Sequence, residues 1–94
     1  MDVVLYARAG CHLCDVARGV ILAQQARTPF AFEEVNIETS DDLTKEYGIR
    51  IPVVTINGVE RFEISVDPAA FATMTKMADM DRPIDRYPKD PEKP

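Results

Sequence analysis

The sequence predicts a small α/β domain, and three patterns in its 94 residues support this fold class. A short apolar block opens the chain, a stretch with helical spacing follows, and a second strand-like segment comes next, which together make a βαβ unit. Further on, Asn57-Gly58 separates two apolar stretches and is a strong signal for a two-residue hairpin. With a helix between these units and another at the end, the predicted element order is βαβαββα.

The first strand and the first helix are the clearest elements. Unbroken apolar character over residues 2–6 is typical of a central strand that is buried on both faces. From Leu13 onward, apolar residues recur three and four positions apart until Thr28-Pro29 interrupts the pattern. This spacing predicts an amphipathic helix that begins at or beside Cys11.

The next two elements are less regular. Residues 30–37 predict a second strand, but the alternation of apolar and polar residues slips at Glu33-Glu34, so the register cannot be read. The pair Thr39-Ser40 offers two alternative N-caps for a short helix over residues 41–47.

The second half of the domain is a hairpin followed by a helix. Residues 49–56 and 59–64 are predicted to form its two antiparallel strands. Asp67-Pro68 then supplies an N-cap followed by a proline at the first helical position, and the apolar spacing of the closing helix ends near Ala78.

Length and composition restrict the chain to one domain with few classes of partner. Residues 1–78 are expected to form the domain, and residues 79–94, rich in proline and charge, an extended or disordered tail. Sixteen acidic against eleven basic residues give a net charge of -5, and the basic positions are scattered, so we expect no nucleic-acid partner. No stretch approaches the ~20 apolar residues of a membrane span, and the apolar stretch near Met1 is shorter than the core of a signal peptide. We therefore expect a cytoplasmic monomer with no membrane contact.

Chemistry is concentrated in the motif Cys11-His12-Leu13-Cys14. At the start of a helix, the Cys11 thiol meets unpaired backbone N–H groups and the positive end of the helix dipole, which lower its pKa from about 8.5 toward neutrality. Cys14 lies one turn further on, where it can attack a mixed disulfide formed at Cys11 and close an internal disulfide. A protonated His12 would stabilise the thiolate, whereas a neutral one would only offer a hydrogen bond.

Other interpretations of the cysteine pair remain open. A zinc site within one chain needs four ligands, and the only histidine already lies inside the motif. Two chains could jointly hold a zinc ion or an iron–sulfur centre through four thiolates. The cysteines could also be inert core residues, although the flanking Gly10 and His12 indicate an exposed junction between loop and helix.

Taken together, the motifs resemble those of small glutaredoxin-like proteins of the thioredoxin superfamily. The resemblance rests on the strand Val3 to Tyr6, the run from Arg8 to Cys14, Ile51-Pro52-Val53-Val54 and Asn57-Gly58, and covers roughly residues 2–78. It implies a thioredoxin-like fold, with a four-stranded mixed sheet in the order 2-1-3-4 flanked by helices.

The resemblance also implies roles for individual residues. Cys11 is expected to be the attacking thiol and Cys14 the resolving thiol. Pro52 is expected to be a cis-proline facing them, with the backbone of Ile51 available to pair with an extended substrate. Arg8 corresponds to a basic residue that can meet a carboxylate of glutathione.

The chain departs from this family at the glutathione site. Glutaredoxins carry Gly-Gly followed by aspartate after the hairpin, whereas this chain reads Ile64-Ser65-Val66-Asp67, so only Asp67 is a counterpart. We therefore expect weak recognition of glutathione. Between the cysteines, His12-Leu13 replaces the Pro-Tyr of most glutaredoxins, which leaves the redox potential open.

These observations predict a thiol–disulfide oxidoreductase without a bound cofactor. Its expected partners are disulfide-containing proteins or glutathione, and glutathione is a candidate reductant of the pair. The alternative is a thioredoxin-fold binding module that holds a metal or iron–sulfur centre between two chains.

Overall fold

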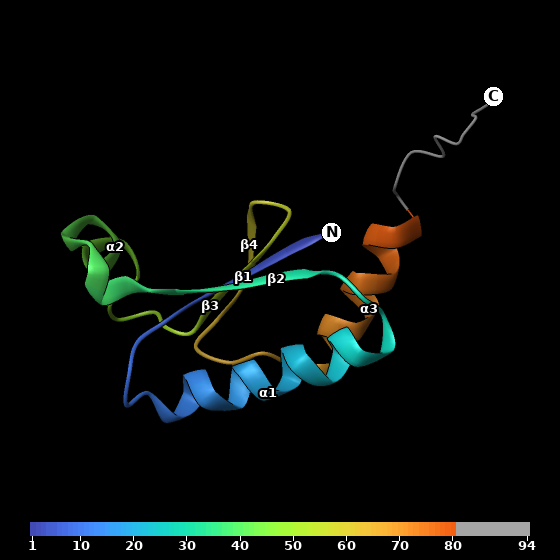
Figure 1. Ribbon diagram of the computed structural model, residues 1–94, viewed down its shortest axis with the longest axis horizontal. Coiled ribbons are helices and arrows are strands. Elements are labelled where there is room, and N and C mark those ends of the chain that lie inside the picture. The colour runs from blue at the N-terminus through green and yellow to red at the C-terminus, as the bar shows by residue number, and fades with distance from the viewer. Residues whose placement is uncertain (81–94) are drawn as a thin grey trace.

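The computed structural model describes residues 1–80, which form a mixed four-stranded sheet with helices packed around it (Figure 1). The strand order is β2-β1-β3-β4, so the predicted α/β class and the predicted 2-1-3-4 order are both confirmed. β2 runs parallel to β1, whereas β3 is antiparallel to β1 and β4 is antiparallel to β3. The strands are β1 (Asp2–Ala7), β2 (Ala31–Asn36), β3 (Val53–Ile56) and β4 (Val59–Glu63).

This described part contains three α-helices, of which two connect strands and the third follows β4. They are α1 (His12–Arg27), α2 (Asp41–Tyr47) and α3 (Pro68–Met80), and a 3-10 turn, η1 (Ile37–Thr39), precedes α2. α3 ends two residues beyond the predicted limit, and the rest of the predicted tail lies outside the described residues. α1 and α3 pack together through a buried hydrogen bond, in which Gln24 Nε2 donates to Thr75 Oγ1 at 3.3 Å.

The core lies on the side of the sheet that α1 and α3 cover. Phe71 of α3 is fully buried and meets the rings of Phe30 and Phe62 edge-on, with centroids 5.9 and 6.1 Å away. Such aromatic contacts add to the free energy gained from burying the rings. The strands and α1 complete this core with Val3, Leu5, Ala7, Cys14, Ala17, Ile21, Val54 and Ile56.

β1 is central but is not equally buried on its two faces. Val3, Leu5 and Ala7 point into the core, whereas Val4 and Tyr6 on the other face are half-buried. The expectation that both faces are buried was therefore only partly right. On the second face, Tyr6 stacks on Tyr47 at the end of α2, with ring centroids 4.3 Å apart. Because α2 is short, it covers only part of that face.

The start of β3 differs from the predicted one, whereas α2 spans the predicted residues 41–47. β3 begins at Val53, not at residue 49, because residues 48–52 form an irregular connection. Ser40, one of the two candidate N-caps, caps α2 by accepting a bond from the Leu43 N–H at 3.4 Å, while Thr39 belongs to η1.

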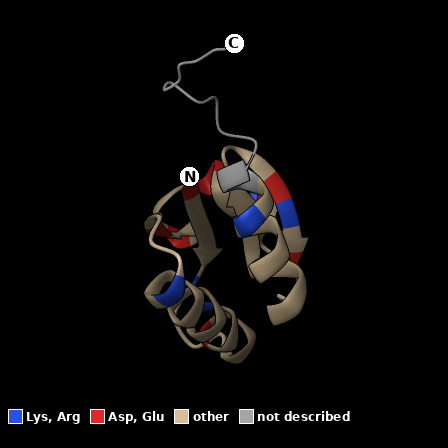
Figure 2. Cartoon of the chain, turned by 90° about the vertical axis from the view of Figure 1, so that its right-hand side faces the viewer, with Lys and Arg blue, Asp and Glu red and all other residues tan. Residues whose placement is uncertain are grey.

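The hairpin turn lies where Asn57-Gly58 predicted it. Asn57 has φ 52° and Gly58 has φ 83°, the positive values that this type of turn requires at both positions. Charged residues of both signs alternate along β4, the outer strand of the hairpin (Figure 2). Such an edge is poorly suited to pairing with further strands.

Candidate active site

The cysteine motif lies at the start of α1, directly after a sharp turn. Gly10 has φ 77°, a conformation that is unfavourable for residues with a side chain, and it turns the chain from β1 into the helix. Cys11 follows as the N-cap of α1, where its sulfur accepts a hydrogen bond from the Cys14 N–H at 3.2 Å. The sulfur therefore occupies the anion-binding position that the sequence predicts for it.

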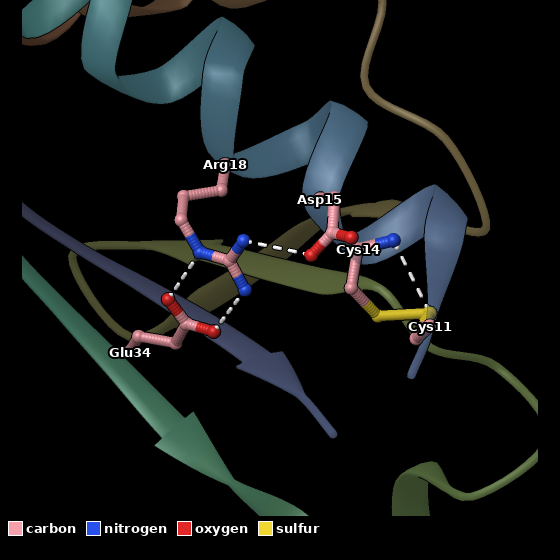
Figure 3. Close-up of a disulfide and its surroundings, with 5 residues drawn as sticks. All are labelled: Cys11, Cys14, Asp15, Arg18 and Glu34. Atoms are coloured by element: carbon pink, nitrogen blue, oxygen red, sulfur yellow. Dashed lines mark hydrogen bonds and ion pairs between the residues drawn. A yellow bond between two sulfur atoms is a disulfide. The ribbon is translucent and has the colours of Figure 1, made fainter. Parts of the chain in front are cut away.

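Cys11 and Cys14 form a disulfide (Figure 3), and their Cα atoms lie 5.2 Å apart. The two cysteines differ in exposure, because Cys11 is half-buried whereas Cys14 is 0% exposed. Only Cys11 can therefore be approached from outside the domain. Its Sγ lies at the surface end of the helix, and the Cys14 Sγ lies behind it against the core.

The segment before β3 lies at the same edge of the sheet as the motif. Tyr6, near the end of β1, pairs with Val53 at the start of β3, so the connection into β3 adjoins the loop that leads to Cys11. The Ile51–Pro52 peptide bond in this connection is cis, and both of its residues are buried. That Pro52 faces the two sulfurs and that Ile51 pairs with substrate stay predictions.

The remaining predicted site residues are polar and exposed. Arg8 lies in the loop before the motif, and His12 opens α1. Asp67 is the N-cap of α3, where its Oδ2 accepts a hydrogen bond from the Ala70 N–H at 3.0 Å. Its carboxylate therefore has a structural role, and a role in binding glutathione stays a prediction for both Asp67 and Arg8.

An ion-pair cluster next to the motif was not predicted from the sequence. Arg18, one turn after Cys14, donates from Nη1 to Asp15 Oδ1 at 2.8 Å and from Nε to Glu34 Oε1 at 2.6 Å, and Nη2 pairs with Glu34 Oε2 (Figure 3). The bonds from Arg18 lower the pKa of the Glu34 carboxyl below its usual value. The cluster fastens α1 to β2 and compensates the negative charge of Asp15 in the first turn of the helix.

A second unpredicted cluster centres on Arg50, directly before Ile51. Its guanidinium pairs with Glu46 of α2 at 3.1 Å and with Glu60 and Glu63 of β4 at 2.9 and 3.2 Å. It also lies over the Tyr47 ring, with Cζ 5.3 Å from the ring centroid. Burial is the main cause that raises the pKa of the Tyr47 hydroxyl. These contacts fasten the connection into β3 to the elements on either side of it.

The described residues contain no group of three or more metal-binding side chains that could hold an ion. Within residues 1–80, no helix is long and apolar enough to cross a membrane. What the motif itself offers is one accessible sulfur bonded to one inaccessible sulfur, an arrangement suited to thiol–disulfide exchange.

Comparisons with known proteins agree with this geometry. The family model of the glutaredoxin-like domain matches residues 2–78. The X-ray structure of protein XcR50 from X. campestris is 31% identical, with a TM-score of 0.66, over 80% of this chain and 96% of that one. The solution structure of protein Ne2328 from Nitrosomonas europaea is 29% identical, also with a TM-score of 0.66, over 78% of this chain and 88% of that one.

A more distant likeness supports the fold alone. A thioredoxin mutant from Halobacterium salinarum is 18% identical, with a TM-score of 0.58, over 81% of this chain and 72% of that one. The predicted thioredoxin-like fold is therefore confirmed. A search of curated proteins finds no match.

Proposed function

Because the chain belongs to the glutaredoxin-like family, we propose that it is a dithiol oxidoreductase that reduces disulfides in proteins or mixed disulfides with glutathione. One observation carries this proposal. The half-buried sulfur of Cys11 lies at the N-terminus of α1, within bonding distance of the fully buried sulfur of Cys14. In this arrangement a substrate can reach Cys11, whereas Cys14 can react only with the Cys11 sulfur.

The first step is attack by Cys11 in the reduced protein. The Cys14 N–H that contacts the Cys11 sulfur, together with the dipole of the 16-residue α1, favours the thiolate. The thiolate attacks one sulfur of the substrate disulfide, and the substrate S–S bond breaks. A mixed disulfide with Cys11 forms, while the other substrate sulfur leaves as a thiolate and takes up a proton.

The second step is resolution by Cys14. The Cys14 thiol loses its proton, and its sulfur attacks the Cys11 sulfur, so that the bond between Cys11 and the substrate breaks. The second substrate thiol is released and the Cys11–Cys14 disulfide remains. Two electrons and two protons have moved from the protein to the substrate, and an external thiol reductant must return them.

Residues around the motif are assigned supporting roles in this proposal. The backbone of Ile51, before Pro52, would pair with an extended substrate, as an added strand does. Arg8 and Asp67 would meet the charged ends of glutathione where it is the bound partner, and His12 would tune the thiolate. We place the protein in the cytoplasm, where thiol reductants can regenerate the dithiol.

Turnover with substituted cysteines tests the proposal. With dithiothreitol as reductant and a small protein with an exposed disulfide as substrate, the wild type should catalyse reduction, and Cys11→Ser should not. Cys14→Ser, reduced beforehand and freed of dithiothreitol, should accumulate a mixed disulfide with the substrate through Cys11, which intact mass and peptide mapping would identify. A wild type that does not accelerate reduction would contradict the proposal, and bound zinc or visible absorbance in freshly purified protein would favour a metal centre between two chains.

A further inference from the structure

We propose that Ile64 determines the specificity of this site, and that the site prefers an extended protein segment with apolar and basic side chains to glutathione. The inference rests on the proposed oxidoreductase function and specifies its substrate class.

The backbone of Ile64 supports the connection into β3. Its N–H donates to two carbonyl oxygens, that of Arg50 at 3.1 Å and that of Pro52 at 2.8 Å. These two carbonyls flank Ile51, the residue whose backbone would pair with a substrate. Ile64 reaches this position with φ 72°, a left-handed conformation that is rare for a β-branched residue.

The side chain of Ile64 adds little to the core at this position. It is 43% exposed, and glycine or asparagine would meet the same backbone requirement more readily. The contribution of the isoleucine is therefore its apolar surface, which lies beside Ile51. A substrate that pairs with the backbone of Ile51 would therefore contact the Ile64 side chain.

Two more exposed apolar side chains belong to the segments that meet at this edge of the sheet. Ile49, in the connection into β3, is 94% exposed, and Leu13, inside the cysteine motif, is 46% exposed. The pairing of Tyr6 with Val53 brings this connection to the end of β1, from which the chain turns into the cysteine motif. We call Leu13, Ile49 and Ile64 the apolar rim. Its three side chains come from three separate segments and would contact apolar side chains of a substrate on either side of its disulfide.

The charges around the site disfavour binding of glutathione, which is an anionic tripeptide. All three guanidinium nitrogens of Arg50 already donate inside the protein, to the Glu46 carbonyl and to the carboxylates of Glu46, Glu60 and Glu63. Arg50 therefore has no pair of N–H groups left for a carboxylate of glutathione, and the three carboxylates around its single guanidinium leave excess negative charge. Exposed Arg8 offers one positive charge before the motif, where a single solvated ion pair contributes little. A neutral or basic protein segment suits these charges better.

Three substrates and four proteins test the inference. The substrates are two short synthetic peptides with the same internal disulfide, one flanked by leucine, valine and lysine and one by serine and glutamate, and glutathione disulfide. The proteins are the wild type, Ile64→Asn, Ile64→Leu and Leu22→Ala. Asparagine accepts the left-handed backbone but is polar, leucine restores the apolar surface, and Leu22 is a matched control, 45% exposed and distant from the rim on α1.

We expect the wild type to show a kcat/KM at least tenfold higher for the apolar peptide than for the other two substrates. Ile64→Asn should raise KM for that peptide by about fivefold, as expected from the loss of a partly buried isoleucine contact, with an unchanged melting temperature. Ile64→Leu should restore KM, and Leu22→Ala should behave as the wild type. Equal turnover of all three substrates, a preference for glutathione disulfide, or an unchanged KM in Ile64→Asn would overturn the inference while the proposed function stands. If the wild type reduces none of the three, the proposed function itself fails.

Discussion

At the scale of single residues, two identical side chains acquire different chemistry from their surroundings. Cys11 caps α1 and keeps part of its surface in water, whereas Cys14, one turn later, faces the core next to Ala17 and Ile21. Backbone N–H groups favour the thiolate of the first, and an apolar environment disfavours the thiolate of the second. This difference is the physical basis of the proposed order, in which Cys11 attacks and Cys14 resolves.

The rate of alkylation as a function of pH measures this difference directly. In the reduced protein, Cys11 should react with iodoacetamide along a titration curve whose midpoint lies below about 8.5, the value of a free cysteine. Cys14 should react more slowly, and its midpoint should not be lowered. Ordinary and equal midpoints for both thiols, followed by mass spectrometry of each peptide, would contradict the assignment of Cys11 as the nucleophile.

The capping role of Asp67 can be separated from any role in binding. Asp67→Ala should lower the free energy of unfolding by about 1 kcal/mol, because the Ala70 N–H at the start of α3 loses its acceptor. Asp67→Asn keeps an oxygen at the same place and should retain most of the stability. Chemical denaturation of the three proteins compares them, and an Asp67→Ala variant as stable as the wild type would show that the cap is dispensable.

At the scale of elements, α1 carries the motif and must be held in place against the sheet. Apolar residues on its inner face supply most of this contact, and Arg18 adds a polar one by joining Asp15 of the helix to Glu34 of β2. The connection into β3 is held in a similar way through Arg50. Both arginines therefore fasten segments that adjoin the disulfide.

The Glu34 ion pair predicts how stability depends on pH. Because Arg18 lowers the pKa of Glu34 in the folded protein, the stabilisation is complete above the unfolded value near 4.5 and is lost as pH falls through the folded pKa. Glu34→Gln should remove this part of the acid dependence and cost about 0.5–1 kcal/mol at neutral pH. Urea denaturation between about pH 3 and 7, which covers the titration of carboxyl groups, measures both effects. Glu33→Gln, at the exposed neighbouring position on the same strand, is the control. If the free energy of unfolding depends on pH in the same way in the wild type and in Glu34→Gln, the Arg18–Glu34 ion pair does not stabilise the protein.

At the scale of the whole molecule, much of the fold could be predicted from the sequence because its signals are local. Helical spacing located α1, and Asn57-Gly58 located the hairpin, since positive φ at both positions is a property of these residue types. The positions of the cysteines relative to α1 followed from the same local pattern.

Features that depend on distant contacts could not be predicted in this way. The Arg18 and Arg50 clusters join residues that are far apart in the sequence, and nothing in the sequence alone indicates which carboxylate each arginine meets. The left-handed backbone of Ile64 contradicts its residue type, because the bonds to Arg50 and Pro52 impose it. The register of β2 also came only from its pairing with β1.

Truncation tests whether the domain is complete within the described residues. The buried side chains of the described part come from residues 3–75, so a chain that ends at Met80 should lose less than about 0.5 kcal/mol of stability. Thermal unfolding of the full and shortened chains makes the comparison. A larger loss would show that residues 81–94 contribute to the stability of the domain.

In the proposed function the Cys11–Cys14 pair donates electrons to substrate disulfides, and its reduction potential shows whether it can do so. Equilibration of the protein with mixtures of reduced and oxidised glutathione, followed by quenching with acid and mass spectrometry, gives the fraction of oxidised pair at each ratio. We predict a potential between about -200 and -270 mV, the range of glutaredoxins and thioredoxin. A value near -120 mV, that of a strong oxidant, would contradict the claim, as would a pair that forms no disulfide at any ratio.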